Sequence, residues 1–309
     1  MSFAAAPLLL SPAQVNEITK SGGQPVSILD STWFMPNSPR NAKLEFLDKR
    51  IPKSQFLDLD EVASSSELGL KHMMPDRQTF AHACGRLGIS PSTHVIIYDA
   101  HGVFSAPRAL FMFRSFGHKN SSIIDGGLPR WIDEGMPVET SSPADLQPTE
   151  YSLPEFDEKS IRSYDEIVSN SQFDPAAEAK SEIVLDARPK GRFNGSDPEP
   201  RAGLSSGHIP HSFSLTFSLF LDKHTTKDGK EYTTFLPPSE IRKALESAVG
   251  PAEAHKIIQG ERSVVTSCGS GMTAGVLWLG LQLLGVKKVG LYDESWTGYA
   301  MRPSSVIQK

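Results

Sequence analysis

The chain has 309 residues, 39% of them hydrophobic and 22% charged, which is typical of a globular protein of one large or two ordinary domains and excludes a disordered or fibrous one. A net charge of -5, without a run of Lys or Arg, argues against direct binding of nucleic acid. Two cysteines, Cys84 and Cys268, cannot form a disulfide framework and indicate a reducing compartment. We therefore expect a cytoplasmic protein, with a mitochondrial location as the alternative.

Neither targeting segments nor membrane spans are predicted. Residues 1–14 have no charged region before their apolar stretch and no Arg-rich face after it, so we expect no secretory signal and no transit peptide. The longest apolar stretch, residues 275–284, is too short for a membrane helix and predicts a buried one. The sequence has no Gly-rich phosphate motif and no cluster of His and Cys, so no cofactor and no metal are expected.

Taken in order along the chain, the predicted elements occur twice. Each half opens with a Ser-capped helix, at Ser11 and at Ser163, and continues with a short buried strand that ends in Asp. The paired segments are the strands at 26–30 and 183–186, the Pro-started helices at 75–87 and 238–249, the apolar strands at 94–99 and 263–268, and the closing strands at 122–125 and 289–293. The second half has extra residues, most of which we place at 251–262.

This duplication predicts two domains of like fold. We expect an N-terminal domain at 1–137, a linker at 138–159 that is rich in Pro, Ser and acidic residues, and a C-terminal domain at 160–309. Short buried strands that alternate with helices predict an α/β fold, with a small parallel sheet flanked by helices in each domain. Ligands of such folds bind beyond the carboxyl ends of the strands. Asp99 and Cys268 both lie there, but only Cys268 is a nucleophile, so one working site is expected in the second half.

The segment from Ser267 to Ala274 has the composition of an anion-binding loop. Gly269 and Gly271 allow the backbone to turn its N–H groups inward around the sulfur of Cys268, and the following helix N-terminus favours a thiolate. The alternative is that Cys268 is simply a small buried apolar residue. Cys84 lies inside a helical pattern, and we assign it a structural role.

These motifs resemble the tandem rhodanese-domain family of sulfurtransferases, in particular its eukaryotic, fungal 3-mercaptopyruvate sulfurtransferase branch. The resemblance covers almost the whole chain. It is based on an ordered set of motifs: Tyr98-Asp99, Asp125-Gly-Gly127, Gly191-Arg-Phe193, Pro198-Glu-Pro-Arg201, Gly207-His-Ile-Pro210, Cys268-Gly-Ser-Gly-Met-Thr273 and Asp293-Glu-Ser-Trp296. Residues 49–53, His211-Ser212 and Glu294 depart from the family pattern; Glu294 borders the expected site and bears on substrate preference.

The resemblance implies specific roles for residues around Cys268. Arg192 and Arg201 would hold the carboxylate and carbonyl of the substrate, and Ser270 would pass a proton together with Asp60 and His72. The loop residues Gly269, Gly271, Met272 and Thr273 would surround the transferred sulfur. From the residues alone, both arginines are also compatible with solvated loop positions, His72 with a loop histidine and Asp60 with a helix cap.

The resemblance also implies a reaction. Sulfur would pass from 3-mercaptopyruvate through a persulfide on Cys268 to a thiol acceptor such as thioredoxin, with release of pyruvate. The uncharged loop argues against thiosulfate as the preferred donor, although a thiosulfate sulfurtransferase remains an alternative. A phosphatase would need an Arg that closes the loop, which is missing. A further alternative is a sulfur-relay adaptor that serves a ubiquitin-like activating enzyme of tRNA thiolation.

Overall fold

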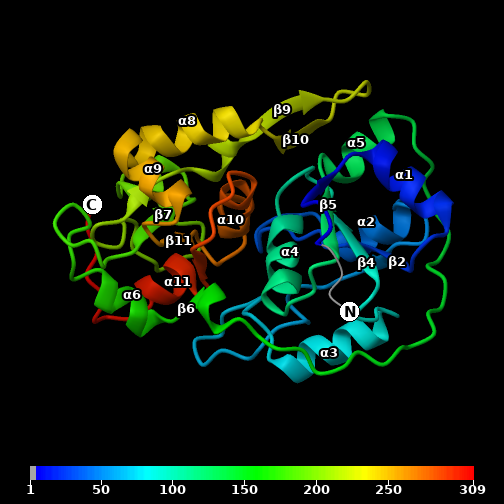
Figure 1. Ribbon diagram of the computed structural model, residues 1–309, viewed down its shortest axis with the longest axis horizontal. Helices are drawn as coiled ribbons and strands as arrows, with labels where there is room; N and C mark the ends of the chain where they lie inside the picture. The colour runs from blue at the N-terminus through cyan, green and yellow to red at the C-terminus, as the bar shows by residue number, and fades with distance from the viewer. Residues whose placement is uncertain (1–4) are drawn as a thin grey trace. The chain divides into compact units, whose positions relative to one another are not determined.

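The structure is a computed structural model that describes residues 5–309, and it divides into two compact units (Figure 1). Unit 1 consists of the segment that ends at Ser64, together with Met74–Asp157 and Asp222–Phe235. Unit 2 consists of Ser65–Met73, Glu158–Leu221 and Leu236–Lys309. Unit 1 thus includes Asp222–Phe235 from the second half of the sequence, and unit 2 includes Ser65–Met73 from the first half.

Unit 1 is built on a five-stranded parallel sheet in the order β1-β5-β4-β2-β3. Its strands are β1 Leu9–Leu10, β2 Val26–Asp30, β3 Gln55–Phe56, β4 His94–Tyr98 and β5 Ser121–Ile124. Its helices are α1 Pro12–Ser21, α2 Ala42–Asp48, α3 Arg77–Arg86, α4 Ala106–Ser115 and α5 Gly127–Asp133. The hairpin of β9 Leu221–Thr225 and β10 Glu231–Phe235 completes the unit, apart from Leu221.

The strands of unit 1 are buried because helices cover both faces of the sheet. On one face, Ile28 and Ile96 pack with Val15 of α1 and Trp131 of α5. On the other face, α4 packs against β4 and β5. Burial on both faces explains why these strands are continuous apolar runs rather than alternating ones. Ser11 caps α1 and exchanges hydrogen bonds with Gln14 in a capping box, as the sequence predicted for this helix start.

Unit 2 repeats this plan with the order β6-β12-β11-β7-β8, again all parallel. Its strands are β6 Ile161–Arg162, β7 Ile183–Asp186, β8 Phe213–Ser214, β11 Val264–Ser267 and β12 Val289–Tyr292. Its α-helices are α6 Tyr164–Asn170, α7 Lys190–Phe193, α8 Pro238–Val249, α9 Pro251–Gln259, α10 Ala274–Leu283 and α11 Ser295–Ala300, with 3₁₀ turns at Glu158–Ser160 and Phe217–Phe220. The predicted α/β fold, with a small flanked parallel sheet in each repeat, is confirmed.

The strand register places Asp99 and Cys268 at the same point of the two sheets. Asp30 lies opposite Tyr98, the residue before Asp99, and Asp186 lies opposite Ser267, the residue before Cys268. The two units can therefore be compared position by position. Most of the extra residues of the second half lie around α9, at the place predicted, and the sequence prediction missed the β9–β10 hairpin.

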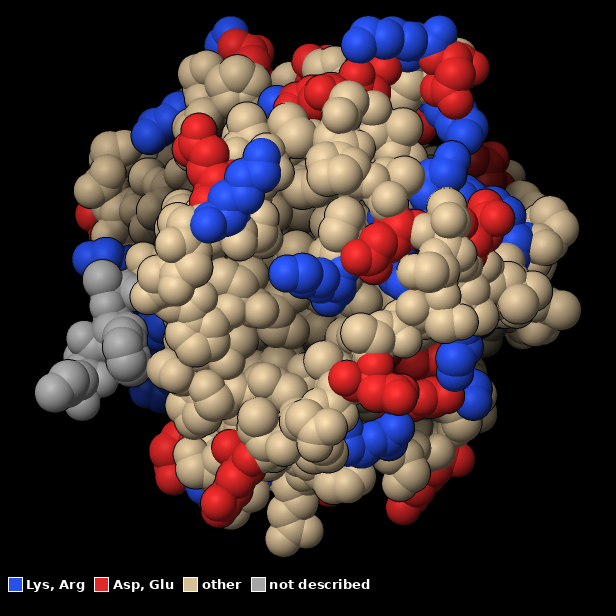
Figure 2. Space-filling model, turned by 90° about the vertical axis from the view of Figure 1, so that its right-hand side faces the viewer, with Lys and Arg blue, Asp and Glu red and all other residues tan. Residues whose placement is uncertain are grey.

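Two further observations concern the surface and the helices. On the face shown in Figure 2, acidic and basic side chains are interspersed, so this face has no continuous expanse of positive charge. Within residues 5–309, no helix combines the length and the apolar character that a membrane span needs.

Candidate active site

Cys268 is the first residue after β11, the central strand of the unit 2 sheet, and only 2% of it is exposed. Its position is fixed by the start of α11. The Cys268 N–H donates to Ser295 Oγ at 3.0 Å, and its C=O accepts from Trp296 N at 2.9 Å. The next carbonyl, that of Gly269, accepts from Thr297 N and Thr297 Oγ1. The base of the cysteine loop is thus held rigidly at the carboxyl edge of the sheet.

The backbone N–H groups from Gly269 to Thr273 make no hydrogen bond to any residue of the described chain. Gly271 has φ of 84°, a left-handed conformation that glycine adopts without strain, and α10 begins at Ala274. The loop therefore presents unpaired donors and a helix N-terminus around the sulfur. Such an arrangement stabilises a thiolate or a bound anion.

The equivalent loop of unit 1 shows what this kind of loop binds. The Asp99 carboxylate is fully buried, and its Oδ2 accepts the N–H groups of Phe104, Ser105 and Ala106 at 2.8–2.9 Å. Its Oδ1 accepts the N–H of His101 at 2.9 Å. In unit 1 a side-chain anion thus occupies the cradle, whereas in unit 2 the same strand end carries Cys268.

His72 belongs to unit 2 and contacts the cysteine loop directly. Its Nε2 lies 2.7 Å from the Ser270 carbonyl oxygen, so Nε2 carries the proton and donates it. His72 is 2% exposed and has φ of 48°. The Ser270 hydroxyl makes no hydrogen bond within the described residues. The histidine therefore holds the loop through its main chain and leaves the Ser270 hydroxyl available.

A buried ion-pair network braces the floor of the site. The Arg188 guanidinium pairs with Asp186 through Nε and Nη2, donates to Glu199 Oε1 at 2.7 Å and lies 4.1 Å from the ring centroid of Trp296. Although burial opposes the charge, the carboxylates of Asp186 and Glu199 hold the pKa of Arg188 above its ordinary value. Since the charges are paired and stacked, Asp186, Arg188 and Glu199 stabilise the structure around the cysteine loop.

Arg192 and Arg201 provide the exposed positive charge of the site. Arg192, at the end of α7, approaches Glu199 Oε2 at 3.5 Å and has 22% of its side chain exposed. The Arg201 guanidinium makes no ion pair among the described residues and lies beside the cysteine loop, where a Cβ on Gly269 would be 3.7 Å from its Nη1. Arg201 thus has its donors free to bind a carboxylate.

Two further residues, Asp60 and Cys84, belong to unit 1. Asp60 is an exposed residue of unit 1 whose carboxylate accepts a hydrogen bond from Trp33 Nε1 at 3.2 Å. Cys84 is buried in α3, and burial raises the pKa of its thiol, which disfavours the reactive thiolate. The structural role expected for Cys84 agrees with this environment.

Glu294, which departs from the family pattern, forms an ion pair with Arg302, which lies just after α11. Its charge is therefore compensated within that helix region. Among residues 5–309, no group of three or more His, Cys, Asp or Glu side chains is placed to hold a metal ion.

Sequence reasoning missed Glu199, Ser295 and Thr297 as parts of the site. Glu199 has 2% of its side chain exposed and contacts both Arg188 and Arg192. Ser295 and Thr297 bind the backbone of Cys268 and Gly269. Glu199 could have been recognised from the sequence by its position between Arg192 and Arg201, since a buried carboxylate needs a cation.

The chain matches the model of the rhodanese-like domain twice, at residues 13–134 and 169–302. It is 37% identical over 283 residues to the probable 3-mercaptopyruvate sulfurtransferase of Schizosaccharomyces pombe, covering 92% of this chain and 89% of that protein. It is also 37% identical over 291 residues to 3-mercaptopyruvate sulfurtransferase of Homo sapiens, with 93% and 90% covered. The crystal structure of the Tum1 protein from Saccharomyces cerevisiae is 28% identical, with a TM-score of 0.81 and 98% and 99% covered. These matches confirm the predicted resemblance.

Proposed function

Because the chain belongs to the rhodanese-like domain family, we propose that it is a sulfurtransferase that takes sulfur from 3-mercaptopyruvate onto Cys268 and passes it to a thiol. The observation that carries this proposal is the loop at Cys268, in which free N–H groups surround a fixed sulfur and an unpaired Arg201 lies alongside. The curated relatives support the choice of donor.

In the first half-reaction, the Cys268 thiolate attacks the sulfur of 3-mercaptopyruvate. A sulfur–sulfur bond forms, the carbon–sulfur bond breaks, and its electron pair leaves as the enolate of pyruvate, which takes up a proton at carbon. The loop from Gly269 to Thr273, including Met272, holds the persulfide through its N–H groups. This step needs no metal and no organic cofactor.

Arg192 and Arg201 bind the carboxylate and the carbonyl of the donor. A guanidinium presents two parallel N–H groups that match a carboxylate, and Arg201 has none of its donors engaged. The hydroxyl of Ser270, two residues after the nucleophile, delivers the proton to the enolate. His72 acts on this step by fixing the Ser270 backbone, and Asp60 is the further acidic member of the relay that the resemblance implies.

In the second half-reaction, a thiolate attacks the outer sulfur of the persulfide and regenerates Cys268. The acceptor is a thiol such as thioredoxin, and a ubiquitin-like activating enzyme of tRNA thiolation is a candidate protein acceptor. We place the reaction in the cytoplasm, with the mitochondrion as the alternative; both compartments keep thiols reduced.

The test is pyruvate release from 3-mercaptopyruvate with a thiol acceptor, compared with thiosulfate as donor. Wild type and Cys84→Ser are expected to turn over 3-mercaptopyruvate in preference to thiosulfate, and Cys268→Ser is expected to be inactive with both donors. Turnover by Cys268→Ser would refute the persulfide scheme. Preference for thiosulfate would identify a thiosulfate sulfurtransferase instead.

A further inference from the structure

In unit 2, two large side chains pack next to the carboxylate of Asp186 at the carboxyl end of β7. They are Arg188 and Trp296, both among the largest fully buried side chains, and the guanidinium lies over the ring at 4.1 Å. The Arg188 N–H donates to Asp186 Oδ1 at 2.9 Å and closes a tight turn. Trp296 N donates to the Cys268 carbonyl. The carboxylate, the cation and the aromatic ring thus form one packed set.

Unit 1 keeps the backbone of this set but replaces both large side chains. Thr32 N donates to Asp30 Oδ1 at 2.9 Å, so Thr32 takes the place of Arg188. Leu128 N donates to the Asp99 carbonyl at 3.0 Å, so Leu128 takes the place of Trp296. Unit 1 retains the acidic residue as Asp30, but it has no side chain equivalent to the Arg188 cation or to the Trp296 ring.

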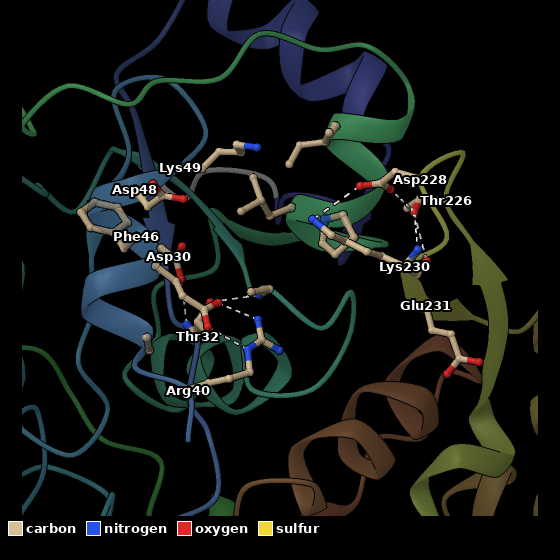
Figure 3. A pocket seen from close by; sticks show the side chains of 16 residues that line it. Asp30, Thr32, Arg40, Phe46, Asp48, Lys49, Thr226, Asp228, Lys230 and Glu231 are labelled. Atoms are coloured by element: carbon tan, nitrogen blue, oxygen red, sulfur yellow. Dashed lines mark hydrogen bonds and ion pairs between the residues drawn. The ribbon is translucent and has the colours of Figure 1, made fainter. Parts of the chain in front are cut away.

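A cavity lies where these side chains are replaced. Its volume is about 550 Å³, and Asp30, Thr32 and Leu128 all line it, together with apolar atoms of Phe46, Pro129 and Ile132. Figure 3 shows the labelled residues around this space. Asp30 is 2% exposed and forms no ion pair with any described residue. The cavity is therefore lined by a buried carboxylate, which accepts hydrogen bonds from Thr32 and Tyr98 but has no paired cation, beside an apolar wall.

The charges at the rim do not neutralise Asp30. Arg40 pairs with Glu45, and Lys230 pairs with Asp228. Asp48, Lys49 and Glu231 also line the cavity and form no ion pair within the described residues. The lining thus contains five acidic and three basic side chains, so its charge favours a cation over an anion.

We propose that this cavity of unit 1 binds a small organic cation, in which an amidinium, guanidinium or ammonium group pairs with Asp30 and an aromatic or aliphatic body packs against Leu128 and Phe46. Such a molecule supplies the two groups that Arg188 and Trp296 supply in unit 2. A planar cation can make two parallel hydrogen bonds to a carboxylate. The lining residues all belong to unit 1, whereas the cysteine loop belongs to unit 2, so cation binding does not depend on the proposed sulfur transfer.

The environment of Asp30 is consistent with this binding mode. Burial raises the pKa of the Asp30 carboxyl to about 6, and the nearby Asp99 adds to the rise. The four N–H groups of the adjacent loop are already engaged by Asp99, so they do not compensate Asp30. A bound cation would provide the missing positive charge.

Benzamidine is a suitable probe because it joins an amidinium to an aromatic ring, and benzamide is its neutral analogue of the same shape. Calorimetric titration of the full-length protein is expected to show saturable binding of benzamidine and none of benzamide at the same concentrations. Asp30→Asn is expected to weaken benzamidine binding about 10- to 100-fold, as the loss of a charge-assisted pair does. Equal binding of the two probes would overturn the proposal.

A second variant tests the site without removing the acid. Thr32→Arg restores the arginine of unit 2 beside Asp30 and is expected to abolish benzamidine binding, whereas Thr32→Ser keeps the hydroxyl and the cavity and is expected to bind normally. Asp58→Asn, a residue of unit 1 that does not line the cavity, is the charge control for Asp30→Asn and should bind as wild type does. Cys268→Ser should also bind normally, which separates this site from sulfur transfer. Unchanged benzamidine binding by both Asp30→Asn and Thr32→Arg would refute the proposed cation site.

Discussion

Arg201 provides the unpaired cation of the candidate active site, since its guanidinium has no ion-pair partner among the described residues and lies beside Gly269. We expect Arg201→Met to raise the KM for 3-mercaptopyruvate about 10- to 100-fold, because the carboxylate loses a charge-assisted pair. Steady-state kinetics with wild type and with Arg242→Met, a surface arginine of α8, as control would measure this. An unchanged KM would exclude Arg201 from donor binding.

Glu199 places a negative charge next to Arg192 and Arg188, and so limits the positive charge available to a donor. Replacing Glu199 by Gln keeps the shape and removes that charge. The ratio of kcat/KM for thiosulfate to that for 3-mercaptopyruvate is expected to rise severalfold, because a dianion gains more from the added positive charge than a monoanion. Glu182→Gln, which alters the ion pair with Arg162, is the control. A ratio that stays constant while both activities fall would indicate a purely structural role.

Single residues were predictable where the local sequence carries the signal. Cys268 follows an apolar strand and precedes two glycines, so its loop could be predicted from eight consecutive residues. Ser295 was missed because its partner, the Cys268 N–H, belongs to another element 27 positions away. Glu199 was missed although Arg188 is only 11 positions away, because a short polar segment does not show that its carboxylate is buried. The contact of His72 with the Ser270 backbone, across 198 positions of sequence, likewise needed the fold.

At the scale of elements, the start of α11 supports the cysteine loop. Ser295 Oγ accepts from Cys268 N and donates to the Tyr292 carbonyl at 2.8 Å, and Ser295 is fully buried. Ser295→Ala leaves both backbone groups unpaired, so we expect a loss of about 1–3 kcal/mol in the free energy of unfolding. Sulfur transfer should fall as the loop loses its anchor. Urea unfolding and steady-state assays, with exposed Ser304→Ala as control, measure both; wild-type values for Ser295→Ala would contradict this role.

The strands and most helices could be predicted because buried apolar runs and capping residues mark them. The β9–β10 hairpin could not, since its strands are largely exposed and polar. It is held by contacts remote in sequence: Phe235 N donates to Asp125 Oδ1, and Val103 N donates to Thr233 Oγ1. Gly102 belongs to the same contact, because a Cβ there would lie 2.5 Å from the Thr233 carbonyl oxygen. Such contacts leave no periodic pattern in the sequence.

At the scale of the whole molecule, Asp30 makes stability depend on pH. Burial, with the charge of Asp99 nearby, raises its pKa from 3.8 to about 6 although hydrogen bonds from Thr32 and Tyr98 oppose the rise. The folded state therefore binds a proton that the unfolded state has released. Stability therefore falls as pH rises from about 4 to about 6, and the ionised group costs about 3 kcal/mol at neutral pH.

Asp30→Asn removes this dependence on pH. The free energy of unfolding of the variant minus that of wild type is therefore expected to increase by about 1–3 kcal/mol from pH 4 to pH 7. Urea unfolding at both values measures the difference, and Asp58→Asn serves as the control. A relative stability that is constant with pH, or that worsens as pH rises, would contradict the raised pKa.

The whole molecule repeats one fold with two different strand ends, and we propose that the reaction takes place at one of them. Unit 1 fills its loop with the Asp99 carboxylate, while unit 2 presents Cys268 to the same kind of loop. The duplication was visible in the sequence because both repeats retain the same order of strands and caps. The cavity of unit 1 was not predicted, since it depends on how the fold packs Thr32 and Leu128 in place of Arg188 and Trp296.

The most direct test of the central claim is a single-turnover reaction of the protein with 3-mercaptopyruvate in the absence of an acceptor thiol. Pyruvate and the sulfur bound to protein are quantified together, and mass spectrometry of peptides locates the sulfur. We expect one pyruvate per chain and one added sulfur atom on the Cys268 peptide, with Cys84 unmodified. Pyruvate release without sulfur on Cys268, or sulfur on Cys84, would contradict it.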